Sequence, residues 1–163
     1  MMNEETESRA RVVLEARSWV GTPYVLGGRI KGVGCDCVTL IAEVMINAGV
    51  WPAATVNNAF AKFGNYSGDW FCNTTAQRYL LAIMRFSKHM ANTRCFASNK
   101  VEAGNIVLTK CAQSKNWNHG GIVVQWPRVV HAYSERVSEV NVSVHHMWTG
   151  NEIAVLNPFK VGD

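Results

Sequence analysis

The chain has 163 residues, of which 48% are hydrophobic and 17% charged, and it carries a net charge of +4. This composition is typical of a globular protein and excludes an intrinsically disordered one, and the length suits a single domain over residues 1–163. No cluster of Lys and Arg predicts a nucleic-acid surface, and no apolar run reaches the roughly 18 residues of a membrane span.

The N-terminus and the cysteines predict a chain that is made in the cytoplasm without a signal peptide. Residues 1–11 are polar and charged, and they lack the apolar core of a secretory signal. Five cysteines are an odd number, so reduced thiols are expected rather than a disulfide framework. A single residue separates Cys35 from Cys37, whereas zinc-binding pairs are usually separated by roughly two to four, which argues against a structural zinc site.

In chain order, the first half predicts helices around a glycine-rich loop. Apolar residues recur at helical spacing over residues 4–20, and Gly21 and Pro23 should end that helix. A loop with four glycines follows over residues 27–34. Helical spacing returns over residues 38–48, where we expect a central buried helix.

Residues 50–73 show no sustained period and hold six aromatic residues among Asn, Gly and Ser. A connection of this length is often a lid or binding loop, although a surface loop pinned by aromatic side chains would have the same pattern. A further helix is expected from residue 76 to about residue 90, with Thr74 or Thr75 as its cap.

The second half predicts an antiparallel meander. Strands are expected over residues 105–110, 119–126, 129–133 and 153–156, with an irregular stretch or edge strand over 137–144 and a turn around 146–150. Helices followed by such a meander indicate an α+β fold.

Cys37 stands where the glycine-rich loop ends and the apolar helical run begins. Unpaired N–H groups and a partial positive charge at a helix N-terminus stabilise a thiolate and lower its pKa. A cysteine nucleophile also needs a base, and the base needs an orienting partner. His119 opens one predicted strand and His131 lies on the next, so these residues are the candidate base and orienting residue. A buried structural cysteine and two structural histidines would give the same spacing.

Several blocks of the sequence resemble the NlpC/P60 family of cysteine peptidases. They are Gly21-Thr22-Pro23-Tyr24, Gly27-Gly28, Gly34-Cys35-Asp36-Cys37, His119-Gly120-Gly121-Ile122-Val123-Val124 and Val130-His131-Ala132. The resemblance implies a papain-like α+β fold, with the nucleophile at the N-terminus of the central helix and the helices packed on an antiparallel sheet. It implies a Cys37–His119–His131 triad that hydrolyses amide bonds in peptidoglycan stem peptides, usually the γ-D-glutamyl–diaminopimelate bond, without a metal or organic cofactor.

The same resemblance assigns expectations to two further residues. The Tyr24 hydroxyl is expected beside the nucleophile, where it and the Cys37 N–H could hold an oxyanion. Asp36 matches an aspartate that can meet a substrate amine, although from its sequence position it could equally be a helix cap. Arg29 and Lys31 in the glycine-rich loop could pair with a substrate carboxylate or could simply be solvated.

Three positions depart from the family pattern. Val38-Thr39 replaces the usual Ser-Gly after the nucleophile, Leu26 replaces an aromatic residue, and Gly104-Asn105 replaces Gly-Asp. None of these changes removes a triad member. Because Val38 and Thr39 alter the start of the helix, they should affect specificity more than chemistry.

Residues 31–37 and 65–70 are most similar to the branch of the family that phages and prophages encode as tail-associated cell-wall peptidases. This similarity implies a location in the virion tail or at the cell wall, with phage tail proteins as partners. Two alternatives stay open. One is a catalytically silent tail component that docks through exposed Trp51, Trp70 and Trp117, and the other is a cysteine-dependent acyltransferase or amidase effector that acts on lipids or proteins.

Overall fold

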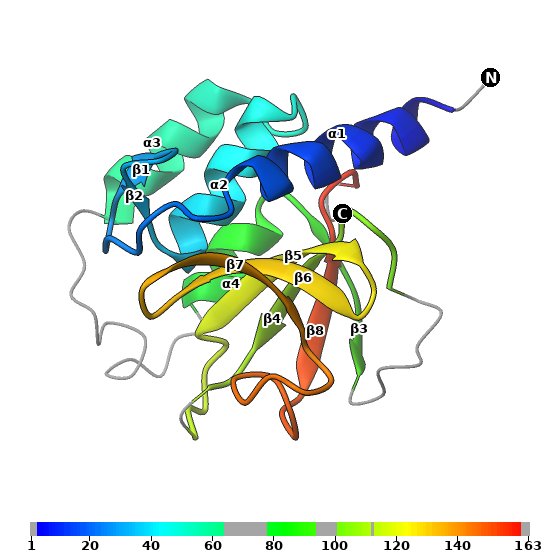
Figure 1. Ribbon diagram of the computed structural model, residues 1–163. Coiled ribbons are helices and arrows are strands. Elements are labelled where there is room, and N and C mark those ends of the chain that lie inside the picture. The colour runs from blue at the N-terminus through cyan, green and yellow to red at the C-terminus, as the bar shows by residue number, and fades with distance from the viewer. Residues whose placement is uncertain (1–2, 64–77, 94–100, 112, 161–163) are drawn as a thin grey trace.

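The computed structural model describes residues 3–63, 78–93, 101–111 and 113–160. Helices occupy the first half of the chain, and a sheet occupies most of the second (Figure 1). The helices are α1 (Glu4–Ser18), α2 (Cys37–Asn47), α3 (Ala53–Phe63) and α4 (Arg78–Met84). The strands are β1 (Arg29–Ile30), β2 (Gly34–Cys35), β3 (Lys88–Thr93), β4 (Ile106–Thr109), β5 (His119–Gln125), β6 (Arg128–Tyr133), β7 (Arg136–Asn141) and β8 (Ile153–Asn157).

The main sheet has six strands in the order β3-β8-β4-β5-β6-β7, and every neighbouring pair is antiparallel. The β4–β5–β6–β7 meander follows the order of the sequence, and β7 is an edge strand, as the sequence predicted. The last strand, β8, lies between β3 and β4. Its uninterrupted burial suits this interior position better than an edge.

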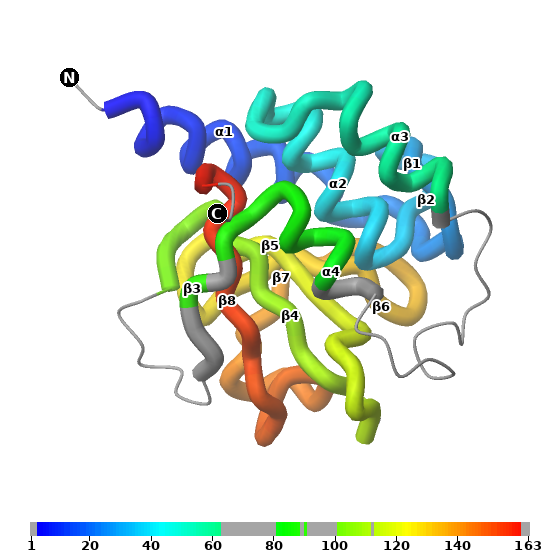
Figure 2. The backbone as a smooth tube through the Cα atoms, turned by 180° about the vertical axis from the view of Figure 1, so that it is seen from behind, coloured from blue at the N-terminus to red at the C-terminus, as the bar shows by residue number. Residues whose placement is uncertain are grey.

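Side chains that alternate along the strands bury both faces of this sheet. Ile106, Leu108 and Ile122 belong to the larger core, which they form with the apolar residues of α1 and α2. Val107 and Val123, their neighbours in the chain, belong to a second core that includes Trp148. Figures 1 and 2 show α1, α2 and α3 gathered at one side of the sheet, so the segment around Trp148 covers the other face.

The central helix α2 forms because its sequence is apolar almost throughout and has a clear start and stop. Leu40, Ile41, Val44 and Met45 are fully buried, and each contributes about 2 kcal/mol of burial free energy. Gly49 ends the segment in a left-handed conformation, with φ of 73°. This buried helix is the rigid element that presents Cys37.

Four expectations about local structure need correction. Residues 53–63 form α3 rather than an irregular connection, because Val56, Ala59 and Phe60 do recur at helical spacing and turn one face inward. The expected helix over residues 76–90 is shorter, and residues 88–93 form β3 because they pair with β8. Part of the glycine-rich loop is the β1–β2 hairpin. Trp51 and Trp117 are 5% and 4% exposed, so they are core residues and not docking residues.

The proposed caps Thr74 and Thr75, and the whole 65–70 block with Trp70, lie outside the described residues. Within the described part of the chain, no helix is both long enough and apolar enough to span a membrane.

Candidate active site

The start of α2 is built around the Asp36 carboxylate. Its Oδ1 accepts hydrogen bonds from the backbone N–H groups of Val38 (3.0 Å) and Thr39 (2.9 Å), and its Oδ2 accepts from the Gly27 N–H (2.7 Å). The Thr39 hydroxyl accepts from the Asp36 N–H (2.9 Å), which completes a capping box. Asp36 therefore caps the helix, fixes Cys37 as its first residue and joins it to the glycine-rich loop.

This arrangement bears on the second expectation for Asp36, a contact with a substrate amine. The side chain is 1% exposed, and both of its oxygens already accept protein hydrogen bonds. Helix capping accounts for the contacts of Oδ1, and the tie to the glycine-rich loop accounts for that of Oδ2. The contact with a substrate amine stays a prediction.

The two cysteines at the start of α2 have different environments. Cys35 is fully buried on β2, and burial together with the Asp36 charge raises the pKa of its thiol to about 12. Cys35 is therefore a protonated, inert thiol at neutral pH. Cys37 is partly exposed and lines a cavity, which agrees with its choice as the candidate nucleophile.

His119 and His131 meet as the predicted hairpin requires. They lie on the paired strands β5 and β6, and His119 Nε2 is 2.8 Å from His131 Nδ1. For His119 Nδ1 to accept a proton from a thiol, its own proton must be on Nε2 and donate to His131. His131 then carries its proton on Nε2, which is buried and has no hydrogen-bond partner among the described residues. The hydrogen bond to His119 and ring packing therefore hold His131.

Burial keeps both imidazoles neutral. It lowers the pKa of His119 well below its ordinary value, and the charges of His131 and His145 lower it further. Burial, followed by the charges of His145 and His146, lowers the pKa of His131 to about 3. Near neutral pH His119 is thus an unprotonated base.

These buried histidines predict that acid destabilises the fold. In the unfolded chain each imidazole takes up a proton below about pH 6.5, whereas His131 in the folded protein resists protonation until about pH 3. The stability contributed by neutral His131 is thus complete above pH 6.5 and is lost as the pH falls. We expect the free energy of unfolding in urea to drop by about 2 kcal/mol or more between pH 7.5 and pH 5.

The variant His131→Asn provides the control for this measurement, because it removes one of the two buried imidazoles. Its pH-dependent loss should be smaller than that of the wild type by about 2 kcal/mol. Equal losses in the two proteins would contradict the assignment of His131 as a buried neutral group.

Aromatic rings enclose the histidine pair. Trp148 is fully buried, and its ring lies 5.4 Å from that of His119 and 6.0 Å from that of His131. Tyr133 lies nearly parallel to His131 at 6.0 Å. Gly121 makes room for this packing, since a Cβ there would lie 2.9 Å from the Val130 carbonyl oxygen and 3.2 Å from His131 Cβ. The second glycine after His119 is thus needed for space.

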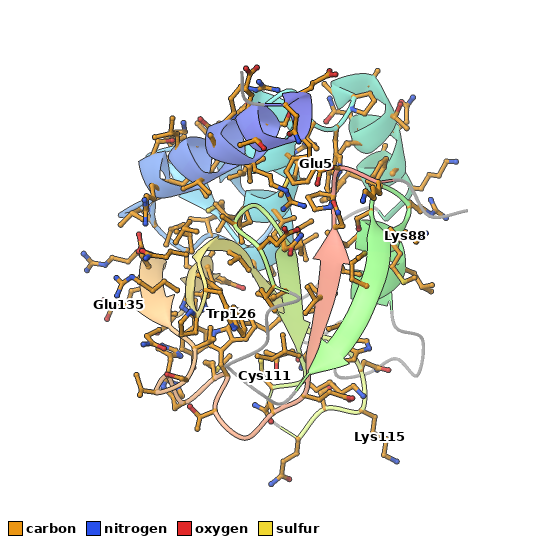
Figure 3. The ribbon with its side chains drawn as sticks, turned by 90° about the vertical axis from the view of Figure 1, so that its right-hand side faces the viewer. Glu5, Lys88, Cys111, Lys115, Trp126 and Glu135 are labelled. Carbon is orange, nitrogen blue, oxygen red and sulfur yellow. The ribbon has the colours of Figure 1, made fainter. Side chains whose placement is uncertain are left out.

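The candidate nucleophile and base border one cavity of about 360 Å³. Its walls come from the start of α2, the β4–β5 connection, β6 with its following turn, and residue 147. The lining residues are Tyr24, Cys37, Cys111, Asn118, His119, Ala132, Tyr133, Ser134 and Met147. Figure 3 labels Cys111 in the connection after β4, and Asn118 closes that connection by two hydrogen bonds with the Cys111 backbone. The cavity thus offers neutral polar groups among apolar walls.

Tyr24 lines the same cavity as Cys37. Its N–H donates to the carbonyl oxygen of Glu135 (2.8 Å), the residue labelled at the β6–β7 turn in Figure 3. Burial and the charges of Cys37, Asp36 and Cys35 raise the pKa of Tyr24 above its ordinary value. The phenol therefore stays protonated and remains a hydrogen-bond donor on a residue of the cavity that Cys37 lines.

The two loop cations have protein partners. Arg29 forms an ion pair with Glu43 and also donates to the Asn57 side chain (2.7 Å), and Lys31 forms an ion pair with Glu15 (2.8 Å). These bonds brace the β1–β2 hairpin against α1, α2 and α3. Among the described residues, no three His, Cys, Asp or Glu side chains converge as a metal site requires.

Sequence reasoning missed the residues that come from turns. Asn118, Ser134, Met147 and Trp148 have no periodicity that marks them. Ser134 has a positive φ of 59°, which is unusual for a residue other than glycine, and neither it nor its neighbours are residue types that predict such a conformation. Only the position of Asn118, directly before His119, could have drawn attention to it.

Comparisons with known proteins support one family. The sequence profile of the NlpC/P60 family matches residues 21–156. The fold is similar to the NlpC/p60 domain of the peptidoglycan hydrolase SagA, with a TM-score of 0.54, 19% identity and coverage of 90% of this chain and 97% of that one. It is similar to an NLP/P60-family protein, described as similar to lipoprotein, from Staphylococcus aureus, with a TM-score of 0.60, 16% identity and coverage of 98% of this chain and 43% of that one.

A third similar structure is an N-acetylmuramoyl-L-alanine amidase from Bacteroides uniformis, with a TM-score of 0.61, 12% identity and coverage of 93% of this chain and 98% of that one. At such identities the likeness concerns the fold. Together with the family match, it confirms the papain-like α+β fold that the sequence predicted. A search of curated protein sequences gave no match.

Proposed function

This chain belongs to the NlpC/P60 family, and on that premise we propose that it is a cysteine hydrolase of peptidoglycan stem peptides. The observation that carries the proposal is the convergence of Cys37, Tyr24 and His119 on one cavity, with His131 hydrogen-bonded behind His119. A helix N-terminus, a neutral imidazole and an orienting group are the parts that acyl transfer by a thiol needs.

The proposed reaction proceeds by acyl transfer. His119 Nδ1 takes the Cys37 proton as the sulfur attacks the stem-peptide carbonyl, and the resulting imidazolium gives that proton to the leaving amine. A water molecule, deprotonated by His119, then attacks the thioester and releases the acid. The proton on His119 Nε2 remains in the bond to His131 throughout, so His131 keeps the imidazole in the productive tautomer.

The Cys37 N–H and the Tyr24 hydroxyl are the proposed donors to the oxyanion. Replacing Tyr24 with Phe removes one donor and keeps the ring. We expect kcat to fall about 10- to 100-fold with little change in KM, because the lost bond forms mainly in the transition state. Steady-state hydrolysis of a soluble stem peptide measures both constants, and a change confined to KM would contradict this role.

We propose the γ-D-glutamyl–diaminopimelate bond as the target, and a tail-associated enzyme of a phage or prophage as the setting. The target rests on the family resemblance around Cys37. The setting rests on the similarity of residues 31–37 and 65–70 to that branch, with tail proteins as the partners.

Digestion of diaminopimelate-type peptidoglycan, with the products identified by mass spectrometry, tests the proposal. New termini at the D-glutamyl residue are the expected result. Cleavage between muramic acid and alanine would instead indicate an amidase. If the muropeptides stayed intact while Cys37 reacted rapidly with iodoacetamide, the proposed substrate would be wrong, but the proposal of a cysteine-dependent enzyme would stand.

The walls of the cavity favour a second candidate, acyl transfer from a substrate with an apolar acyl group. Ala132, Met147 and Tyr133 contribute apolar surface to the cavity that Cys37 lines, and its described lining contains no Asp, Glu, Lys or Arg. Incubation with a p-nitrophenyl acyl ester of medium chain length, followed by mass spectrometry of Cys37, would reveal a stable acyl-enzyme in that case.

A further inference from the structure

The segment over residues 142–150 covers the histidine pair, and His145 organises it. The His145 carbonyl oxygen accepts hydrogen bonds from the Trp148 N–H (2.9 Å), the Thr149 N–H (3.0 Å) and the Thr149 hydroxyl (3.0 Å). Its ring Nδ1 accepts from the Met147 N–H (3.3 Å). The backbone and the side chain of one residue thus shape the turn that carries Met147 and Trp148.

This turn reaches the candidate active site in three places. Met147 lines the cavity, and the Trp148 ring packs against both His119 and His131. The His145 ring meets the His131 ring edge to face, with centroids 5.1 Å apart and an interplanar angle of 87°. Because the buried Nε2 of His131 has no hydrogen-bond partner among the described residues, ring contacts of this kind help to set its orientation.

The contact with the Met147 N–H requires a particular state of His145. An imidazole nitrogen accepts a hydrogen bond only when it carries no proton, so the ring must be neutral, with its proton on Nε2. Protonation would place an N–H against the Met147 N–H and a positive charge beside His131. That charge would also oppose the imidazolium that His119 must form during the reaction.

The titratable groups around His145 come from three parts of the fold. His131 and Tyr133 on β6 contact its ring. His146, in the same turn, stacks on it with ring centroids 4.7 Å apart. His119 on β5 interacts with it through charge. Burial and the charge of His146 lower the pKa of His145 below that of a free imidazole, so its ring is neutral near pH 7.

We propose that His145 is a positioning residue of this active site, which holds Met147, Trp148 and His131 in place only while its ring is neutral. The inference rests on the proposed function, because His131 matters only if His119 is a base. It adds a residue outside the triad on which the active form depends.

Two substitutions separate the hydrogen bond from the charge. In His145→Asn the amide oxygen takes the place of Nδ1, so the variant keeps an acceptor for the Met147 N–H but cannot be protonated. His145→Phe keeps a flat ring against His131 and lacks the acceptor. His146→Asn is the matched control, because it removes the neighbouring, exposed imidazole and leaves the His145 hydrogen bonds intact.

The first readout is the rate at which iodoacetamide alkylates Cys37, followed by peptide mass spectrometry between about pH 5 and pH 8. At pH 7.5 we expect His145→Phe to lose about tenfold in rate and His145→Asn to lose less than about threefold. On the acid side, the logarithm of the rate should fall more steeply with decreasing pH in the wild type and in His146→Asn than in His145→Asn. In the first two proteins both the Cys37 thiolate and the His145 ring take up a proton, whereas in His145→Asn only the thiolate does.

The second readout is nuclear magnetic resonance of the imidazole nitrogens and of the Met147 amide. In the wild type the Met147 amide should shift with the same midpoint as the His145 ring, and in His145→Asn that shift should vanish. A wild-type Met147 amide insensitive to pH, or an unchanged slope in His145→Asn, would overturn the proposal. Both readouts work without peptidoglycan, so a wrong substrate would leave this test unaffected.

Discussion

Replacing Cys37 with alanine is expected to reduce hydrolysis of peptidoglycan by about 10³-fold or more, because it removes the sulfur at the start of α2 that forms the thioester in the proposed reaction. The change removes one partly exposed sulfur atom at the first position of α2, where alanine is a good helix former. Thermal unfolding should therefore shift little. Release of soluble stem peptides, quantified by mass spectrometry over several hours, measures the loss.

Cys35→Ala is the matched control, since the same atom is removed two residues away. Cys35 is fully buried and its raised pKa keeps it protonated. We expect this variant to lose about 1–2 kcal/mol of stability through the cavity it leaves, and to keep its activity at a temperature where it is folded. A Cys37→Ala variant that still hydrolyses stem peptides would exclude thiol catalysis at this site. If the wild type neither hydrolysed stem peptides nor reacted with iodoacetamide at Cys37, the alternative of a catalytically silent tail component would be favoured.

The sequence predicted those parts of the fold whose determinants are local. Apolar spacing and glycine stops marked α1 and α2, and short apolar runs on either side of Pro127 marked β5 and β6. The juxtaposition of His119 and His131 followed from hairpin pairing alone, because β5 and β6 are adjacent in the chain. Each of these features depends on residues close in sequence.

What the sequence did not predict either depends on distant contacts or lacks a clear periodic pattern. β3 is a strand because β8 pairs with it, and β8 comes about 60 residues later in the chain. The segment over residues 142–150, which covers the histidine pair, has a shape that depends on the hydrogen bonds of His145. No periodic pattern in the sequence predicts those bonds. Aromatic residues among Asn and Gly also masked the helical spacing of Val56, Ala59 and Phe60 in α3.

The role of Asp36 could not be decided from the sequence, because its position allowed both a helix cap and a contact with substrate. Replacing it with alanine should lower the free energy of unfolding by about 2–4 kcal/mol. The N–H groups of Val38 and Thr39 would lose their acceptor in a buried site, and that of Gly27 would lose its acceptor in a partly buried one. Denaturation in urea measures the loss, and the alkylation rate of Cys37 should fall with it, because the start of α2 is no longer fixed.

Asp36→Asn distinguishes the two roles. Its amide oxygen can still cap Val38 and Thr39, while its NH₂ group faces the Gly27 N–H and cannot accept from it. If Asp36 is a cap, this variant should recover about half of the stability lost in Asp36→Ala and show a KM close to that of the wild type. If Asp36 also binds a substrate amine, KM should rise about tenfold or more while the helix start stays folded, because a charged partner has been replaced by a neutral one. The four hydrogen bonds that the buried carboxylate already accepts favour the first outcome.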